Sequence, residues 1–159
     1  MTTRLWLAGV AAALLTCAAW AAPCEENRLV LALYDSTEEA TPCPELTETH
    51  KLLEMPLNRL GMVVEYHDVS KRPLPDSSRY RAIVVWVNDE TVVEPVEYCR
   101  WFAGALKAGT RGIIIESIGA GQGPGGEVTP SEEVEAVWAA WGLKSDGAVE
   151  ATNNPFLVE

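Results

Sequence analysis

The sequence predicts an α/β fold in which a mostly parallel sheet carries helices on both faces. Three continuous apolar runs, at residues 28–34, 82–87 and 112–116, each end at polar residues. Such runs are typical of strands that are buried on both faces of a parallel sheet. Helical patterns lie between them, and this alternation indicates a three-layer domain with the order β-α-β-β-α-β-α.

The more polar, alternating segment at residues 62–69 predicts an edge strand, and the strand at 112–116 is expected at the centre of the sheet. The proline-rich segment 70–81 is too short for a full helix. A short final strand is expected near residues 156–158.

The first helix is expected from Leu46, with Leu53, Leu57 and Leu60 on its apolar face and Gly61 as its stop. Pro56 interrupts this pattern, so we expect a kink or a restart there.

The second and third helices have clearer boundaries. Pro95 is expected in the first turn of one, and Gly109 ends it. Its apolar stripe consists of Cys99, Phe102, Ala103 and Leu106. In the other, Thr129 is predicted as the N-cap, with Pro130 as first helical residue and Glu132 completing a capping box. Its apolar face is Val134, Val137, Trp138 and Trp141, and Gly142 ends it.

The amino terminus has the pattern of a secretory signal peptide at residues 1–21. A basic residue, an apolar run and the small-residue site Ala19-Trp20-Ala21 follow one another, and the run is too short for a membrane span. A lipoprotein signal ending at Cys17 is the competing interpretation, although Thr16 departs from its usual pattern. We therefore expect a periplasmic or secreted protein in which residues 22–159 form one domain. The abrupt ending leaves a truncated C-terminus open.

The charge and the cysteines narrow the function classes. A net charge of −11 argues against nucleic acid and an anionic membrane as partners, and it fits either a solvated surface or a cationic partner. Cys24 and Cys43 flank the first strand, so a disulfide between them fits an oxidising compartment, although sequence does not fix connectivity. Cys99 is expected as a buried thiol.

Ligands of open α/β sheets bind at the carboxyl ends of the strands. The polar residues at the predicted strand ends, all candidates for a site, are Asp35, Ser36, His67, Asp68, Asn88, Asp89, Glu116 and Ser117. The residues expected to line a ligand pocket are Asp35, Ser36, Asn88, Asp89, Glu116, Ser117 and Gly119. Their carboxylates could hold a cation such as Mg²⁺, or they could simply form turns. We expect no metal and no cofactor.

Ser117 is the one weak candidate for a nucleophile, because it follows a buried strand as the serine of a G-x-S-x-G elbow does. Only half of that pattern is present. Any serine–histidine pair would have to use His50 or His67, and surface or capping roles are expected for both.

The glycine-rich segment contains Gly121, Gly123 and Gly126 in a G-x-G-x-x-G pattern. A dinucleotide fingerprint belongs after the first strand with a helix starting inside it, and neither condition holds here. Among the tryptophans, Trp86 and Trp138 are expected in the core, whereas Trp101 is expected to be partly exposed, where stacking on sugars is conceivable.

Four stretches together resemble the class I glutamine-amidotransferase-like, flavodoxin-like domain of exported Pel-type exopolysaccharide-processing proteins. They are "LVLALYDSTEEATP", "ETHKLLEMPLNRLGMVVEYHDV", "LPDSSRYRAIVVWVND" and "PVEYCRWFAGALKAGTRGIIIESIG". The chain departs from the catalytic Cys-His-Glu set of amidotransferases, since no cysteine stands at the Ser117 turn and no histidine follows it.

The resemblance implies a non-catalytic accessory or binding module in periplasmic exopolysaccharide or envelope metabolism, with a polysaccharide or a protein as partner. Two alternatives stay open at this point. One is a small serine hydrolase that uses Ser117, and the other is a truncated remnant of a longer polysaccharide-modifying enzyme.

Overall fold

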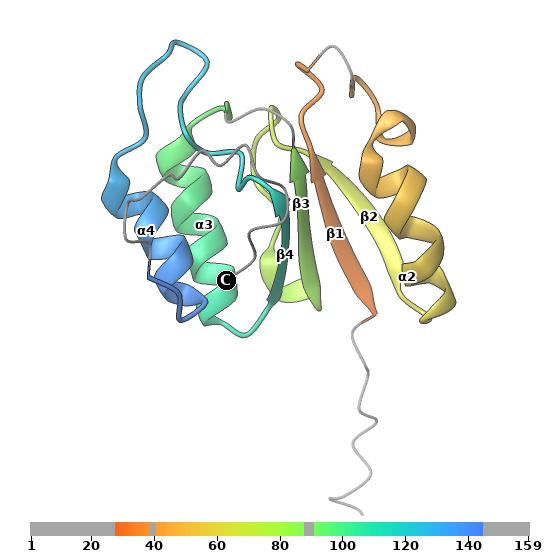
Figure 1. Cartoon of the computed structure of the whole chain (residues 1–159). Coiled ribbons are helices and arrows are strands. Elements are labelled where there is room, and N and C mark those ends of the chain that lie inside the picture. The colour runs from red at the N-terminus through yellow and green to blue at the C-terminus, as the bar shows by residue number, and fades with distance from the viewer. Residues whose placement is uncertain (1–27, 39–40, 88–90, 145–159) are drawn as a thin grey trace, which may run out of the picture.

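The structure is a computed structural model that describes residues 28–38, 41–87 and 91–144. Its centre is a sheet of four strands in the order β2-β1-β3-β4 (Figure 1). The strands are β1 (Leu29–Tyr34), β2 (Val63–Asp68), β3 (Ala82–Val87) and β4 (Arg111–Glu116), and every neighbouring pair is parallel. The predicted parallel sheet is confirmed.

Helices cover both faces of this sheet. A π-helical segment, η3 (Thr49–Glu54), continues into α2 (Met55–Arg59) on one face, and α3 (Pro95–Lys107) and α4 (Ser131–Ala140) pack side by side on the other (Figure 1). Two single 3₁₀ turns, η2 (Pro44–Leu46) and η4 (Ser77–Arg79), lie in connecting segments. The architecture is the expected three-layer, flavodoxin-like α/β fold.

The core divides along the alternation of side chains in the central strands. In β1, Leu31 and Leu33 face α3 and α4 and belong to the larger apolar cluster, whereas Val30 belongs to the smaller cluster beneath α2. The predicted stripe of α3 is fully buried in the larger cluster, and burial raises the pKa of the Cys99 thiol to about 11. Trp86 and Trp138, expected in the core, are only half-buried.

The first helix differs from its prediction. Leu53 and Leu57 pack against the smaller cluster as expected, but the side chain of Leu60 is 73% exposed. The chain is π-helical up to Glu54 and becomes α-helical at Met55, immediately before Pro56. Proline has no N–H for a bond to the preceding turn, which accounts for a change of helix type there. Leu57 also follows the π-helical segment and still packs inward, so the exposure of Leu60 coincides with the end of the helix, where Leu60 is the C-cap residue after Arg59.

The start of α4 also corrects a prediction. The helix begins at Ser131 with Pro130 in the N-cap position, and no side chain caps it. The Thr129 hydroxyl is buried without a hydrogen-bond partner, so the predicted capping box is absent. The predicted stops are present, since Gly61, Gly109 and Gly142 all have positive φ angles directly after helices.

Strand β2 lies at an edge, as predicted. Strand β4, expected to be central, is the outermost strand on the other side of the described sheet. Its side chains are accordingly less buried than those of β1 and β3, and Ile113 is 38% exposed. The final strand predicted near residues 156–158 lies outside the described residues.

Other predictions also fall outside the described residues: the signal peptide at 1–21, Asn88, Asp89 and Cys24. The pairing of Cys24 with half-buried Cys43 therefore stays a prediction. Within the described ranges, no helix is long and apolar enough to span a bilayer.

Candidate functional site

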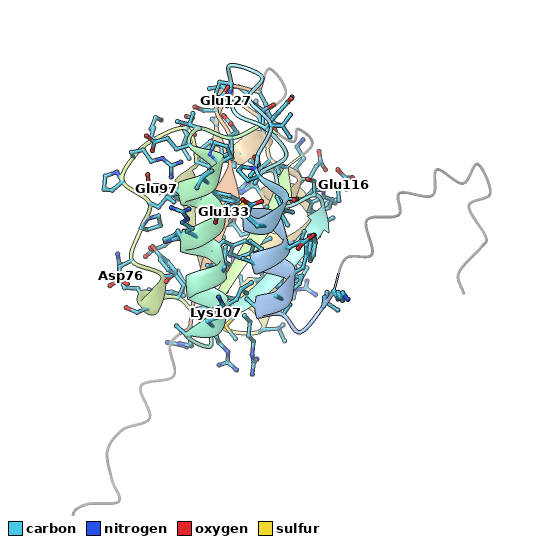
Figure 2. All side chains as sticks on the ribbon, turned by 90° about the vertical axis from the view of Figure 1, so that its left-hand side faces the viewer. Asp76, Glu97, Lys107, Glu116, Glu127 and Glu133 are labelled. Carbon is cyan, nitrogen blue, oxygen red and sulfur yellow. The ribbon has the colours of Figure 1, made fainter. Side chains whose placement is uncertain are left out.

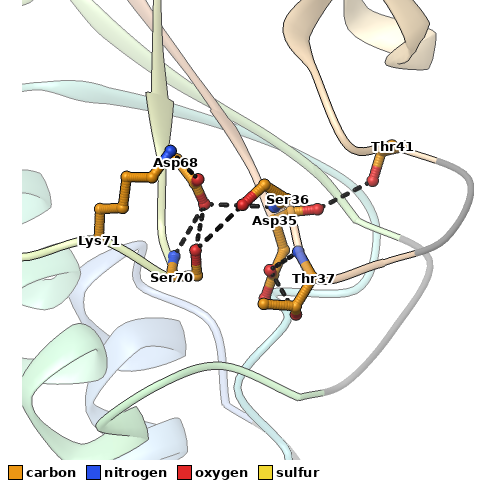
Figure 3. Close-up of polar contacts among 7 residues, drawn as sticks. All are labelled: Asp35, Ser36, Thr37, Thr41, Asp68, Ser70 and Lys71. Atoms are coloured by element: carbon orange, nitrogen blue, oxygen red, sulfur yellow. Dashed lines mark hydrogen bonds and ion pairs between the residues drawn. The ribbon is translucent and has the colours of Figure 1, made fainter.

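The carboxyl ends of β1 and β2 are joined by a polar network built around two buried aspartates (Figure 3). Asp35 follows β1, and its Oδ1 accepts hydrogen bonds from the Thr37 N–H at 2.7 Å and the Thr37 hydroxyl at 2.6 Å. The Thr41 hydroxyl donates to the Asp35 carbonyl oxygen at 3.0 Å. Asp35 therefore shapes the turn that leaves β1.

Asp68, the last residue of β2, holds the two strand ends together. Its Oδ1 accepts from the Ser36 N–H at 3.2 Å, the Ser70 N–H at 3.1 Å and the Ser70 hydroxyl at 2.7 Å. Lys71 Nζ lies 2.9 Å from Oδ2. The predicted candidates Asp35, Ser36 and Asp68 thus lie together, and their hydrogen bonds serve the turns of this edge.

The protonation of Asp68 follows from this network. Burial opposes the charged form and would raise the pKa of its carboxyl, but the hydrogen bonds from Ser36, Lys71 and Ser70 outweigh burial and hold that pKa well below its usual range. The carboxylate is therefore ionised, with Oδ1 engaged by three hydrogen bonds and Oδ2 by the ion pair with Lys71. The described residues contain no group of three or more histidine, cysteine, aspartate or glutamate side chains placed to hold a metal ion.

The carboxyl end of β4 forms a tight, strained turn. The Ser117 N–H donates to the Ile115 carbonyl oxygen at 3.0 Å, and Glu116 between them has a φ of 70°. A positive φ at a non-glycine residue is unfavourable. The strained residue of this turn is Glu116 and not Ser117, whose Oγ accepts a hydrogen bond from the Gly119 N–H at 3.0 Å.

The histidines do not meet Ser117. His67 lies on β2 and Ser117 follows β4, at the opposite edge of the described sheet, so three strand spacings of about 4.8 Å separate their strands. His50 lies beyond β2 on η3, where its Nδ1 is 2.6 Å from Glu54 Oε2. A pair of Ser117 with either histidine is therefore not formed.

His67 differs from the surface role predicted for it. It is half-buried, and its Nε2 is buried without a hydrogen-bond partner. Burial lowers the pKa of its imidazole, which favours the neutral form.

The glycine-rich loop uses its own backbone groups. The Gly123 N–H donates to the Glu127 carbonyl oxygen at 2.8 Å, and the Gly126 N–H donates to the Gly123 carbonyl oxygen at 2.9 Å. Gly119 and Gly126 have positive φ angles, which explains glycine at these two turns. Since α4 begins only at Ser131, the loop lacks the arrangement of a phosphate-binding helix start.

A concave feature of the described surface lies between the amino end of α3 and the end of the glycine-rich loop. We call it the acidic groove, and its volume is about 790 Å³. Figure 2 faces this side of the molecule, with Glu97 on α3, Glu133 on α4 and Glu127 on the loop above them. The groove is lined by Glu94, Pro95, Val96, Glu97, Arg100, Trp101, Glu127, Val128, Thr129 and Pro130.

Carboxylates dominate the charge of the acidic groove. Arg100 is bound to Glu133 of α4 through two nitrogen atoms, with Nε 2.9 Å from Glu133 Oε1. Glu94 Oε2 lies 3.3 Å from Arg72 Nε. Among the described residues, no hydrogen bond or ion pair engages the side chains of Glu97 and Glu127.

The apolar part of the groove is centred on Trp101, the tryptophan predicted to be partly exposed. Its indole N–H donates to the Pro75 carbonyl oxygen at 2.9 Å, and its ring centroid lies 6.2 Å from those of Tyr98 and Phe102. The ring is therefore held in one orientation. Val128, at the loop end, is 79% exposed.

Sequence reasoning found the strand-end residues but not the acidic groove as a unit. Its two sides come from segments about 30 residues apart, and no local spacing connects them. The only sequence signals were an exposed tryptophan and a net negative charge.

Comparisons of the chain with protein-family models, with curated proteins and with solved structures return no match.

Proposed function

We propose that this protein is a non-catalytic binding module of periplasmic exopolysaccharide or envelope metabolism, and that the acidic groove is its recognition site. The observation that carries the proposal is the groove itself, in which a fixed tryptophan ring and exposed Val128 lie beside Glu97 and Glu127, whose carboxylates have no partner among the described residues. Concave sites with an apolar lining and a few charged groups are the usual form of ligand sites.

The proposal of a non-catalytic role is supported by the state of the strand ends. The carboxylate of Asp68 and the hydroxyl of Ser117 are both engaged by neighbouring backbone N–H groups. A serine nucleophile needs a base within hydrogen-bond reach. His67 lies on β2, at the opposite edge of the described sheet from β4, and His50 on η3 is bound to Glu54 and lies beside the Tyr66 ring.

The cellular setting rests on sequence alone. The signal-peptide pattern at residues 1–21 and the resemblance to exported amidotransferase-like domains support export and a place in exopolysaccharide metabolism. The net charge of −11 favours a positively charged ligand in that compartment.

The proposal is tested by calorimetric titration of the mature chain, residues 22–159. The ligands are oligomers of glucosamine with free amines, oligomers of N-acetylglucosamine, and a lysine-rich peptide. We expect binding of at least one cationic ligand, weakened by the double substitution Glu97→Gln/Glu127→Gln, and no binding of the neutral oligomers. Binding that this double variant leaves unchanged would contradict the site.

A separate assay tests the non-catalytic part. The mature chain is incubated with a panel of acyl esters beside the Ser117→Ala variant. We expect no turnover by either protein. Ester hydrolysis that disappears in Ser117→Ala would establish the hydrolase alternative instead.

A further inference from the structure

We propose that the ligand of the acidic groove is a short peptide segment of a partner protein, in which lysine or arginine residues flank an apolar side chain. This inference rests on the proposed function, because it names the ligand class of the same groove. Three features of the described residues support it: an apolar lining, carboxylates without a partner among the described residues, and a shortage of hydrogen-bond donors.

The apolar lining provides a place for an aliphatic or aromatic side chain. Trp101 is held by its bond to Pro75 and by its contacts with neighbouring rings, so it presents a preformed surface. Val128 is 79% exposed at the opposite side of the groove. Burial of such a valine by a ligand gains free energy without ordering a long side chain.

The charges select the flanking residues of the peptide. Glu97 and Glu127 are unpaired in the described structure, whereas the positive Arg100 is neutralised by Glu133. The amino end of α3 adds only about half a positive charge. The groove therefore has a net negative potential, which attracts lysine and arginine side chains.

Glycines in the loop leave space for one of these carboxylates. A Cβ atom on Gly123 would lie 2.5 Å from Glu127 Oε1, and one on Gly125 would lie 2.5 Å from Glu127 Oε2. The carboxylate of Glu127 is thus seated against the bare backbone of the loop. The glycines at positions 123 and 125 therefore leave room for the Glu127 side chain, which is one of the carboxylates of the groove.

The same features disfavour a glycan. A sugar ring presents hydroxyl groups around its edge, and these need both donors and acceptors from the protein. In the groove, the Trp101 indole N–H and the Arg100 guanidinium are already engaged. The remaining side chains are mainly carboxylates, prolines and valines, which match a cationic and apolar peptide better.

Fluorescence anisotropy with three labelled peptides of equal length tests the inference on the mature chain. The first peptide alternates lysine with leucine, the second replaces each leucine by serine, and the third replaces each lysine by glutamate. An unlabelled glucosamine oligomer with free amines serves as competitor. We expect the lysine–leucine peptide to bind about tenfold more tightly than either other peptide.

Variants place that binding in the groove. We expect Glu97→Gln/Glu127→Gln and Val128→Ser each to raise Kd at least about fivefold, because each removes one part of the recognition. Glu135→Gln removes a comparable carboxylate from the exposed side of α4 and is expected to change Kd by less than about twofold. Thermal melts of all variants confirm that they are folded.

Each other outcome overturns the inference in a distinguishable way. If the lysine–serine peptide binds as tightly as the lysine–leucine peptide, no apolar side chain is needed for recognition. If the groove variants keep the parental Kd, the peptide binds elsewhere. Tighter binding of the glucosamine oligomer than of the lysine–leucine peptide replaces the peptide by a glycan while the proposed function stands. Failure of every cationic ligand to bind overturns both. A dimer that Val128→Ser dissociates would assign the groove to a second copy of the chain.

Discussion

Asp68 is the residue on which the β1–β2 end of the sheet depends. It is 5% exposed and receives hydrogen bonds from both sides of the strand junction. This buried carboxylate accepts hydrogen bonds from the turn after β1 and from the turn after β2, so it fixes both turns. Its charge therefore contributes to the stability of the fold, and its oxygens are engaged by these contacts.

The first prediction follows from this charge. Asp68→Asn should lower the free energy of unfolding at pH 7 by about 1–3 kcal/mol, because charge-assisted bonds are replaced by weaker ones. The folded-state pKa of Asp68 is depressed, so its contribution is present above the unfolded pKa of about 4 and is lost as pH falls below it.

Urea denaturation at pH 7 and at pH 3 checks this prediction. The parent should lose more stability between these pH values than Asp68→Asn does. Glu135→Gln, a control on the exposed side of α4, should keep the parental difference. Equal losses in the parent and Asp68→Asn would show that Asp68 is not the group responsible.

Glu116 gives a second prediction at the same scale. Its φ of 70° is one that glycine adopts without steric cost. Glu116→Gly should therefore raise the free energy of unfolding by about 0.5–1 kcal/mol, whereas Glu116→Ala, which keeps the Cβ atom, should bring no gain. Chemical denaturation of both variants decides the matter. A loss of stability in the glycine variant would mean that the glutamate side chain, and not the backbone angle, determines the turn.

The sequence predicts the position of a single residue well when that position depends only on residues adjacent to it in the chain. Asp35, Ser36 and Asp68 were found because strand ends follow from apolar runs. Ser70 and Lys71 were not singled out, since their bonds to Asp68 arise only when the chain turns back after β2. The strain at Glu116 had no sequence signal, because glutamate gives no indication of a positive φ angle.

At the scale of elements, periodicity predicted what packs against the sheet. The α3 stripe and the buried strands β1 and β3 were predicted correctly because their apolar residues are regularly spaced, whereas β4, predicted as central, lies at an edge of the described sheet. The first helix was only half correct. The helix ends at Arg59, one residue before Leu60, so the last residue of the predicted apolar stripe lies beyond the regular helix and is exposed.

The contact between β4 and α4 gives the third prediction. A Cβ atom on Gly112 would lie 2.6 Å from Trp141 Cζ2 and 3.0 Å from Leu106 Cδ2. Gly112→Ala should therefore lower the free energy of unfolding by about 1–3 kcal/mol, because it overpacks the interface.

Gly104 provides the matched control for that substitution. It lies in α3, and a Cβ atom there would contact nothing within 4 Å. Gly104→Ala should raise the free energy of unfolding by up to about 1 kcal/mol through helix propensity. If both alanine variants had the same stability as the parent, Gly112 would not be a site of close approach.

At the scale of the whole molecule, the carboxyl edge of the sheet has two parts, a structural network at the ends of β1 and β2 and the proposed binding groove beside α3. The polar groups at the ends of β1 and β2 form hydrogen bonds with one another. The acidic groove beside α3 has carboxylates without a partner in the described part of the chain, and it has an exposed valine. Sequence predicted the edge from the fold, but the groove requires two distant segments to meet and was therefore missed.

The central claim is that recognition takes place in the acidic groove and not at the strand ends. Chemical-shift mapping tests it most directly, with the lysine–leucine peptide titrated into a ¹⁵N-labelled chain of residues 22–159. The account predicts that the largest shifts fall on the Trp101 indole N–H and on residues 94–101 and 127–130. Shifts concentrated instead on Asp35, Ser36 and Ser117, with the Trp101 signal unchanged, would contradict it.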